Sequence, residues 1–421
     1  MKLSFTLLLL IPFFLLAQPK KILLLSAAYD LALKNYPLVK QRELLKQTAA
    51  INIENLGKGF LPQVNLSGQA GYQSDVTAIK IPLPGVNIPS PSKDQYRIVA
   101  DINQLLYDGN NIKVQKDIQR LNENTEQQKI EIELYRIKDR INQLFLGVLF
   151  LDEQLKQVDL VKNDLSIGIK KTEAQVSNGV AFRSNLNVLK AELLKTDQRT
   201  IELTTTRKGL TDVLSLFIGE TLPDEVVLEK PVITATPAGT DIQRPELKLY
   251  SVQEKLLNGQ NKLIDSRTRP RASFYLESGY GRPGLNLLKN DFAFFYTTGV
   301  RLNWAFGGLY TQKKEKQLIE LGKRSIGIQK EIFLLNTNTV LKQQEAEISK
   351  MKKLIAKDYE IIELRVKVKD AAKVQLDNGV ITANDYLREV NAEDQSRQSL
   401  ITHQVQLLQA QINYQNTSGK Q

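Results

Sequence analysis

The chain has 421 residues, a formal net charge of +11, one histidine and no cysteine. The absence of cysteine excludes disulfide bonds, thiol chemistry and a lipid anchor on cysteine. Basic and acidic side chains alternate along stretches such as EIELYRIKDR. This is the pattern of a solvated, ion-paired helix face, so the net charge does not predict a nucleic-acid partner.

The first 17 residues have the organisation of a secretory signal peptide. MKLSFTLLLLIPFFLLA places one lysine before an almost continuous apolar run and ends on a small residue. The run is too short to span a bilayer, so residues 1–17 are predicted to be a cleaved signal for export.

The rest of the chain is a tandem duplication. Proline, glycine and tyrosine residues recur at a spacing of 208 in the first part of each copy, and an Asn-Gly-Val tripeptide recurs at a spacing of 200 in the second part. The predicted organisation is a first repeat at 18–219, a proline-containing linker at 220–240 and a second repeat at 241–421. Because self-similarity at a fixed spacing marks a repeated structural unit, both copies are expected to share one fold.

Each repeat predicts a helix, two strands, a long helix and a returning helix. The first repeat has a helix at about 26–60, strands at about 62–74 and 95–107, and a helical hairpin at about 110–217. The second has a helix at about 241–268, strands at about 270–281 and 291–304, and a hairpin at about 309–416. Apolar residues from Ile130 to Val158 alternate four-three spacing, which is the seam of a coiled coil. A helix over 110–175 would be about 100 Å long.

The predicted strands alternate apolar and polar residues. In the first strand Val64, Leu66, Gly68, Ala70 and Tyr72 share one face, and Asn65, Ser67, Gln69, Gly71 and Gln73 share the other. Segments of about ten residues with this pattern and aromatic ends are typical of transmembrane barrel strands, although a soluble sheet with one buried face alternates in the same way. In a membrane four strands leave two unpaired edges, so closure requires further chains: two would give eight strands and three would give twelve. Polar inward residues favour the twelve-stranded channel.

Two other segments complete the chain. The insert at 76–94 contains four prolines and is predicted to be a surface loop without chemistry. The tripeptides Asn178-Gly179-Val180 and Asn378-Gly379-Val380 are predicted helix ends, because asparagine and glycine both tolerate positive φ. After each, the chain reverses, so the tripeptides form the tips of two helical hairpins. They are either partner-docking sites or ordinary turns.

No catalytic constellation is present in the sequence. His403 lies among glutamine and leucine residues, with no second histidine, no cysteine and no compact carboxylate cluster to complete a metal site. Serine and threonine have no His-Asp partner arrangement, and no glycine-rich phosphate loop occurs. The sequence therefore predicts neither an enzyme nor a bound cofactor.

Taken together, the chain resembles the TolC-like outer-membrane efflux protein family. The stretches that carry the resemblance are SAAYDLALKNYPLVKQR, GFLPQVNLSG, TRPRASFY, LLYDGNN, WAFGGLY, NGVAFRSNLNVLKAE and NGVITANDYL. The resemblance covers nearly all of the mature chain. It implies a mainly α fold with a membrane β-barrel: a homotrimer with a twelve-stranded barrel in outer-membrane lipid, on a long α-helical coiled-coil tunnel through the periplasm. It further implies the exit duct of an efflux pump or type I secretion system, with a periplasmic adaptor and an inner-membrane pump docked at the tips.

The resemblance also implies a constriction just after the second tip, where the family has acidic residues three apart. Asp385 matches the first of these, Arg388 stands in place of the second, and Glu389 follows. Asp385, Arg388 and Glu389 are therefore expected to narrow the tunnel mouth. The alternative is that Asp385 is a helix N-terminal carboxylate that interacts favourably with the helix dipole. For the whole protein the competing hypothesis is a soluble periplasmic coiled-coil scaffold or chaperone, which the outward apolar strand faces would distinguish from a duct.

Overall fold

The computed structural model describes residues 21–77, 90–233, 241–287 and 289–420. The predicted signal peptide and most of the proline-containing insert lie outside these residues. The chain divides into two compact units, which consist of residues 1–37, 134–242 and 337–421 and of residues 38–133 and 243–336. The long helices α3 (Asn111–Ser177) and α6 (Gly308–Asp377) contribute to both units.

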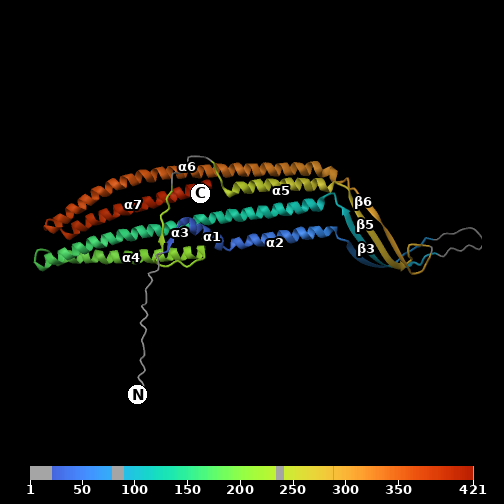
Figure 1. Cartoon of the computed structure of the whole chain (residues 1–421), viewed down its shortest axis with the longest axis horizontal. Coiled ribbons are helices and arrows are strands. Elements are labelled where there is room, and N and C mark those ends of the chain that lie inside the picture. Colours follow the sequence, from blue (N-terminus) through green and yellow to red (C-terminus); the bar gives the residue numbers. More distant parts are fainter. Residues whose placement is uncertain (1–20, 78–89, 234–240, 288, 421) are drawn as a thin grey trace, which may run out of the picture. The chain divides into compact units, whose positions relative to one another are not determined.

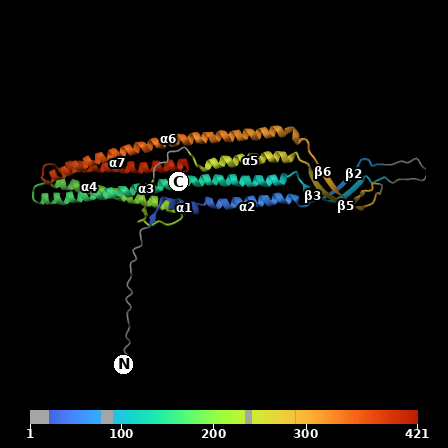
Figure 2. The ribbon, with the colours of Figure 1, turned by 45° about the horizontal axis from the view of Figure 1, so that its top comes forward.

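The unit made of residues 38–133 and 243–336 contains a four-stranded antiparallel sheet. Its strands are β2 (Gln63–Tyr72), β3 (Asp94–Tyr107), β5 (Arg271–Arg282) and β6 (Ala293–Asn303), in the order β2-β3-β5-β6 (Figure 2). Among the described residues, β2 and β6 each have one edge without a neighbouring strand. The helices of this unit are α2 (Leu38–Gly57), the short 3-10 turn η1 (Lys58–Phe60), α5 (Pro245–Arg267) and the first parts of α3 and α6.

The strand register places the alternating residues on two distinct faces. Leu66 lies opposite Ala100, and Phe274 lies opposite Val300, so these side chains share one face. That apolar face is solvent-exposed: Leu66 is 72% exposed, Phe294 68% and Leu302 71%. In a soluble sheet such a face would be covered by a second layer of structure.

The other face of the sheet is polar, with two aromatic side chains set into it. Phe295 is buried there, because Gly279 on the neighbouring strand leaves space where a Cβ would lie 2.6 Å from its ring. The guanidinium of Arg97 lies 5.1 Å from the centre of the Phe295 ring. On β5, the Tyr275 ring lies over Gly299 in a similar way and is 4.8 Å from the guanidinium of Arg301. Arg97 and Arg301 on this face are therefore held over aromatic rings.

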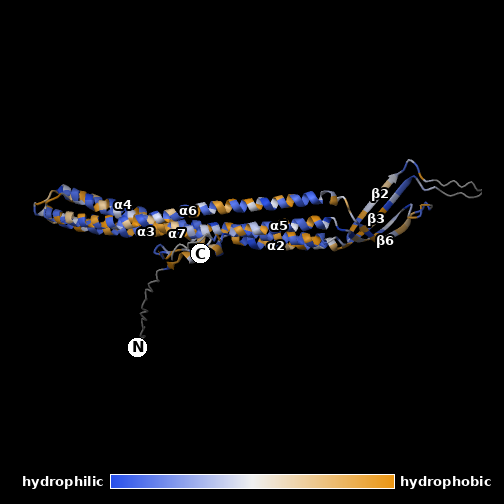
Figure 3. Ribbon diagram, turned by 90° about the horizontal axis from the view of Figure 1, so that it is seen from above, coloured by the Kyte–Doolittle hydropathy of each residue, from blue (hydrophilic) through white to orange (hydrophobic). Residues whose placement is uncertain are grey.

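The other unit is built from two antiparallel helical hairpins (Figure 1). The second part of α3 pairs with α4 (Arg183–Ile218), and the second part of α6 pairs with α7 (Ala383–Ser418). The predicted seam on α3 is confirmed, since Ile141, Val148 and Val158 are completely buried. Figure 3 shows hydrophobic residues interspersed with hydrophilic ones along these helices, as expected for helices that bury only part of their surface.

Two features differ from the sequence-based expectation. The single helix expected at 26–60 is wrong: α1 (Leu25–Asn35) ends before Pro37, and α2 begins at Leu38. Proline lacks an N–H and forces the preceding residue out of helical conformation, and Tyr36 has φ −65° and ψ 129°. In addition, the segment expected to be a linker contains β4 (Val227–Leu228), which pairs in parallel with β1 (Ile22–Leu23).

Helix α1 closes the unit against the end of α4. The rings of Tyr36 and Phe217 are stacked with centroids 6.5 Å apart, and the Asn35 amide donates to the carbonyl of Ile218. That carbonyl belongs to the last residue of α4, so Asn35 satisfies one of the groups that a helix end leaves unpaired. Within the described residues, none of the helices combines the length and the apolar character needed to cross a membrane.

Candidate functional site

The first hairpin tip ends α3 with a Schellman motif. Gly179 has φ +76°, its N–H donates to the carbonyl of Val176 over 3.1 Å, and the N–H of Val180 donates to the carbonyl of Gln175 over 2.8 Å. These two bonds satisfy carbonyls that the helix end would leave free, and they require a left-handed residue at the glycine position. The tripeptide therefore ends the helix and reverses the chain because its glycine can adopt the positive φ that this motif requires.

The second tip repeats the geometry of the first at the same offsets. Gly379 has φ +73°, its N–H donates to Leu376 over 3.0 Å, and the N–H of Val380 donates to Gln375 over 2.8 Å. A Cβ on Gly179 or Gly379 would meet nothing within 4 Å, so space does not require glycine at either tip. The positive φ alone requires it.

The tips expose apolar side chains. Val180 is 74% exposed, Phe182 80% and Val380 71%, and they gather at the turns of the two hairpins. These side chains contribute little to the stability of the chain, because they are not buried against it. They provide a surface that a partner protein could cover.

The two tips are joined to each other. The side-chain amide of Gln175 donates to the carbonyls of Leu376 over 3.2 Å and Asp377 over 3.3 Å, and the Lys171 ammonium forms an ion pair with the Asp377 carboxylate. Beneath them lies one hydrophobic cluster that draws on all four helices: Val161, Leu165, Ile169, Leu189, Ala372, Leu376, Ala383, Tyr386, Leu387 and Val390. Its largest member, Tyr386, is 1% exposed, and burial raises its pKa to about 12. The tips are thus fixed to one another by packing and hydrogen bonds.

Asp385 completes a capping box at the start of α7. The Thr382 hydroxyl donates to the Asp385 carboxylate over 2.7 Å, the Thr382 N–H donates to it over 3.1 Å, and the Asp385 N–H donates back to the hydroxyl over 3.3 Å. The hydrogen bonds from the Thr382 hydroxyl and backbone lower the pKa of Asp385, and the positive charge of Arg388 lowers it slightly further. Asp385 is therefore the N-terminal carboxylate that the alternative interpretation described, and it remains accessible to solvent.

Arg388 and Glu389 lie one turn further along α7. The Arg388 side chain is 74% exposed, and its Nε lies 3.2 Å from a Glu389 carboxylate oxygen. The other Glu389 oxygen lies 3.6 Å from Arg365 on α6. The first turns of α7 bring the three predicted constriction residues together, and within this chain Arg388 has Glu389 as its ionic partner.

A second charged cluster lies between the hairpins and was not predicted. Lys369 on α6 is 13% exposed; its ammonium lies 2.8 Å from the Asp164 carboxylate and 2.6 Å from Glu393, which also pairs with Arg397 over 2.6 Å. Burial alone would lower the pKa of Lys369, but the hydrogen bonds and charges of Asp164 and Glu393 outweigh it and raise the pKa above its ordinary value. The spacing of 200 could have revealed the cluster, because it aligns Lys369 with Ile169 and Glu393 with Leu193.

His403, the one histidine of the chain, has a structural partner. Its Nδ1 lies 2.6 Å from the Asp358 carboxylate, across α6 and α7. No group of three histidine, cysteine or carboxylate side chains within the described part of the chain is arranged to hold a metal ion.

Comparison with known proteins identifies the fold. No family model and no curated protein matches the sequence. Among solved structures, the chain is similar to the outer membrane protein VceC from Vibrio cholerae, with 12% identity, a TM-score of 0.65, and coverage of 94% of this chain and 96% of that one. It is also similar to CusC, with 13% identity, a TM-score of 0.68, and coverage of 94% and 92%. The outer-membrane channel OprN matches with 12% identity, a TM-score of 0.68, and coverage of 94% and 90%. The chain therefore has the fold of these outer-membrane channels, as the resemblance to the TolC-like family implied.

Proposed function

We propose that the chain forms an outer-membrane exit duct. Three copies would close a twelve-stranded barrel in the lipid, and their helices would continue as a tunnel into the periplasm. Residues 1–17 would direct export of the chain. Small molecules or proteins would leave the cell through this duct, delivered by an efflux pump or a type I secretion system.

The observation that carries this proposal is the four-stranded sheet, which is apolar on one face and polar on the other and has no strand paired at either edge within the described part of the chain. Hydrocarbon would cover the apolar face, and the polar face would line a wet lumen. Unpaired backbone groups are costly in lipid, so β6 of one copy would pair with β2 of the next until the sheet closes. The strands have 10 to 14 residues, which is long enough to span a bilayer, because a tilted strand needs about 9–11.

The direct test combines fractionation with a matched pair of substitutions. The wild-type protein should sediment with the outer membrane and run as a trimer in mild detergent. Leu66→Arg should impair assembly, because an arginine facing lipid near mid-bilayer costs about 2–4 kcal/mol. Ser67→Arg, on the next residue and the opposite face, should be tolerated. Recovery of the wild-type protein as a soluble periplasmic monomer would overturn the proposal and favour the scaffold or chaperone.

The tips are the proposed docking surface for a periplasmic adaptor and, through it, an inner-membrane pump. The exposed side chains of Val180, Phe182 and Val380 support this assignment. The double variant Gly179→Val, Gly379→Val would place a β-branched residue at positive φ in both tips, which is sterically unfavourable. We expect trimers that insert normally and no longer support export in cells. Full export by this variant would reduce the tripeptides to ordinary turns.

Asp385, Arg388 and Glu389 are the proposed constriction. Rings of charged side chains are a common way for pores to select ions, and three copies of the start of α7 would bring three such sets around one axis. The solvent accessibility of Asp385 and the 74% exposure of Arg388 support this role, because both side chains are available to a neighbouring copy.

A further inference from the structure

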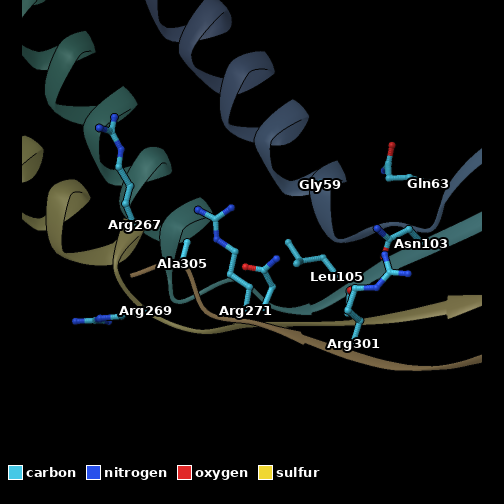
Figure 4. Close-up of a pocket in the computed structure, with 11 residues that line it drawn as sticks. Gly59, Gln63, Asn103, Leu105, Arg267, Arg269, Arg271, Arg301 and Ala305 are labelled. Carbon is cyan, nitrogen blue, oxygen red and sulfur yellow. The ribbon is translucent and has the colours of Figure 1, made fainter. Parts of the chain in front are cut away.

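A pocket of about 410 Å³ lies on the polar face of the sheet, where the strands meet the helices. Four arginines line it: Arg267 at the end of α5, Arg269 in the following turn, Arg271 at the start of β5 and Arg301 on β6 (Figure 4). No acidic side chain is among its lining residues. In Figure 4, Arg271 and Arg301 extend from the sheet toward the side on which Asn103 lies, while Arg269 extends away from them.

The strand register explains why the cations gather here. Arg271 lies opposite Asn303, and Ser273 lies opposite Arg301, so the two arginines stand on the same face of adjacent strands, one rung apart. Alternation puts every second residue on this face. The amide of Asn303, opposite Arg271, and those of the paired residues Gln63 and Asn103 also line the pocket, and these groups can donate hydrogen bonds.

The positive charge of the pocket is left largely uncompensated. Arg267 has Glu315 at 3.8 Å, but within the described residues Arg269, Arg271 and Arg301 form no ion pair with a carboxylate. Arg301 instead lies over the ring of Tyr275, and Arg269 donates to the carbonyl of Gly109 over 3.5 Å. Arginines that repel one another and lack acidic partners favour an anion from outside the chain.

The nearest acidic residues on the same face of the sheet do not line the pocket. Asp101 lies opposite Glu277, four residues along β5 from the rung of Ser273 and Arg301. Four residues of strand extend about 14 Å. The pair of Asn103 and Tyr275 lies between these two layers, about 7 Å from each, and neither acidic side chain lines the pocket.

We infer that this pocket binds the anionic groups of solutes, namely carboxylates, phosphates or sulfonates, and that it makes the duct prefer anions. Arginine suits this task because its planar guanidinium donates two parallel hydrogen bonds to such a group. The ring of Tyr275 restricts the guanidinium of Arg301, which reduces the entropy lost on binding. The part of the inference that concerns transport rests on the proposed function, since only in the closed trimer would three pockets surround one lumen.

Anion binding is tested first, without reference to transport. Inorganic pyrophosphate is titrated calorimetrically into the detergent-solubilised full chain. The wild-type protein should bind it, and Arg271→Gln or Arg301→Gln should each weaken binding by roughly tenfold, or about 1.4 kcal/mol, because each removes a charge-assisted contact with the anion. Arg282→Gln is the matched control: it changes the same residue type on the same strand but on the apolar face, where Arg282 pairs with Asp94. Absence of wild-type binding, or an equal loss in the control, would overturn the inference.

Selectivity is then measured as the reversal potential of the trimer in planar bilayers of zwitterionic lipid under a KCl gradient. We expect anion preference in the wild type, which falls on the order of fivefold in the double variant Arg271→Gln, Arg301→Gln. The double variant Arg271→Lys, Arg301→Lys should keep the preference, because the charge remains, and should bind pyrophosphate more weakly.

Channels that open without anion preference would overturn the inference and leave the proposed duct function standing. Pyrophosphate binding by a protein that forms no channel would instead overturn the proposed function. Binding that leaves the current unchanged would assign the pocket to a lipid headgroup and overturn the assignment to solutes.

Discussion

The two hairpin tips have the same backbone and different chemistry. Both end a helix with glycine at positive φ and close it with the same pair of hydrogen bonds. They differ immediately afterwards: the N-cap residue of α4 is Phe182, which makes no side-chain cap, whereas that of α7 is Thr382, which forms a capping box. Both repeats have therefore kept the glycine that the backbone geometry of the turn requires. The residues that follow the turn differ between the repeats.

The difference continues into the helices below the tips. Leu165, Ile169, Leu189 and Leu193 of the first hairpin align, at a spacing of 200, with Arg365, Lys369, Glu389 and Glu393 of the second. The first three leucine and isoleucine side chains are buried in the cluster beneath the tips. Their charged counterparts pair with each other across α6 and α7, Arg365 with Glu389 and Lys369 with Glu393. At these four positions the first hairpin is thus closed by apolar contacts and the second by ion pairs, while both hairpins contribute to the hydrophobic cluster beneath the tips.

This difference in closure has a physical consequence. Apolar contacts are non-directional and tolerate small shifts, while buried ion pairs depend on geometry and lose much of their stabilisation when one partner is removed. The second hairpin should therefore be the more sensitive of the two to single substitutions and to charge. It is also the hairpin that carries the proposed constriction.

Removal of Lys369 should have the largest effect. Lys369→Met leaves Glu393, which is 6% exposed at its side chain, with Arg397 as its remaining partner, and leaves Asp164 without its buried cation. We expect a loss of about 2–3 kcal/mol in the free energy of unfolding, measured by guanidinium titration followed by circular dichroism.

Two variants control this experiment. Lys367→Met removes a lysine two residues away whose ion pair with Glu363 is fully on the surface, and it should change stability by less than about 0.5 kcal/mol. Lys369→Ile combined with Glu393→Leu transfers the residues of the first hairpin into the second and should recover the part of the loss that comes from the buried Glu393 carboxylate. If this double variant is less stable than Lys369→Met alone, closure of the second hairpin does not depend on its ion pair.

The tip glycines should give a smaller and equal effect in both hairpins. Gly179→Ala and Gly379→Ala each place a Cβ at positive φ, which costs about 1–2 kcal/mol, and neither meets a steric obstacle. Gly209→Ala is the control, because Gly209 lies inside α4 with open space around it and alanine there should stabilise by about 0.5–1 kcal/mol. Clearly unequal losses at the two tips would contradict the equivalence of their backbones.

The sequence could predict the features that depend on local rules. Asn-Gly-Val located both tips because positive φ is a property of the residues themselves, and alternation located the four strands and their faces. The helix break at Pro37 was not predicted, although the effect of proline on the preceding residue is an equally local rule. The pairing of β1 with β4 joins Ile22 to Val227 over two residues each, which is too short to leave a pattern in the sequence.

The candidate site was predictable to a lesser degree for the same reason. The positions of Asp385 and Arg388 followed from alignment on the tip, and Asp385 was considered as a helix N-terminal carboxylate. The capping box with Thr382 was not predicted, although the spacing of Thr382 and Asp385 could have indicated it. The contact between Lys369 and Asp164 depends on which helix packs beside α6, and single-helix periodicity does not contain that information. Comparison of the two repeats does indicate which positions changed from apolar to charged.

Asp385 should give the smallest change in stability and the sharpest distinction between the two interpretations of its role. The hydrogen bonds from Thr382 lower its pKa, so its contribution is fully present above the unfolded-state pKa of about 3.9 and is lost as the pH falls through the lower folded-state value. Asp385→Asn introduces the residue that the first hairpin has at Asn185. The unfolding midpoints of variant and wild type should differ slightly at neutral pH and converge below about pH 4.

The same variant tests the constriction in single-channel recordings. Three carboxylates around a narrow axis attract cations, so Asp385→Asn should change conductance and weaken block by divalent cations at neutral pH, and acidification of the wild type should reproduce both effects. Arg388→Ala should strengthen divalent block, because Arg388 no longer shields the acidic groups. A variant that shifts only the unfolding midpoint, with conductance and block unchanged, would restrict Asp385 to capping α7. The capping box that distinguishes the second tip from the first would then stabilise the second hairpin without gating the duct.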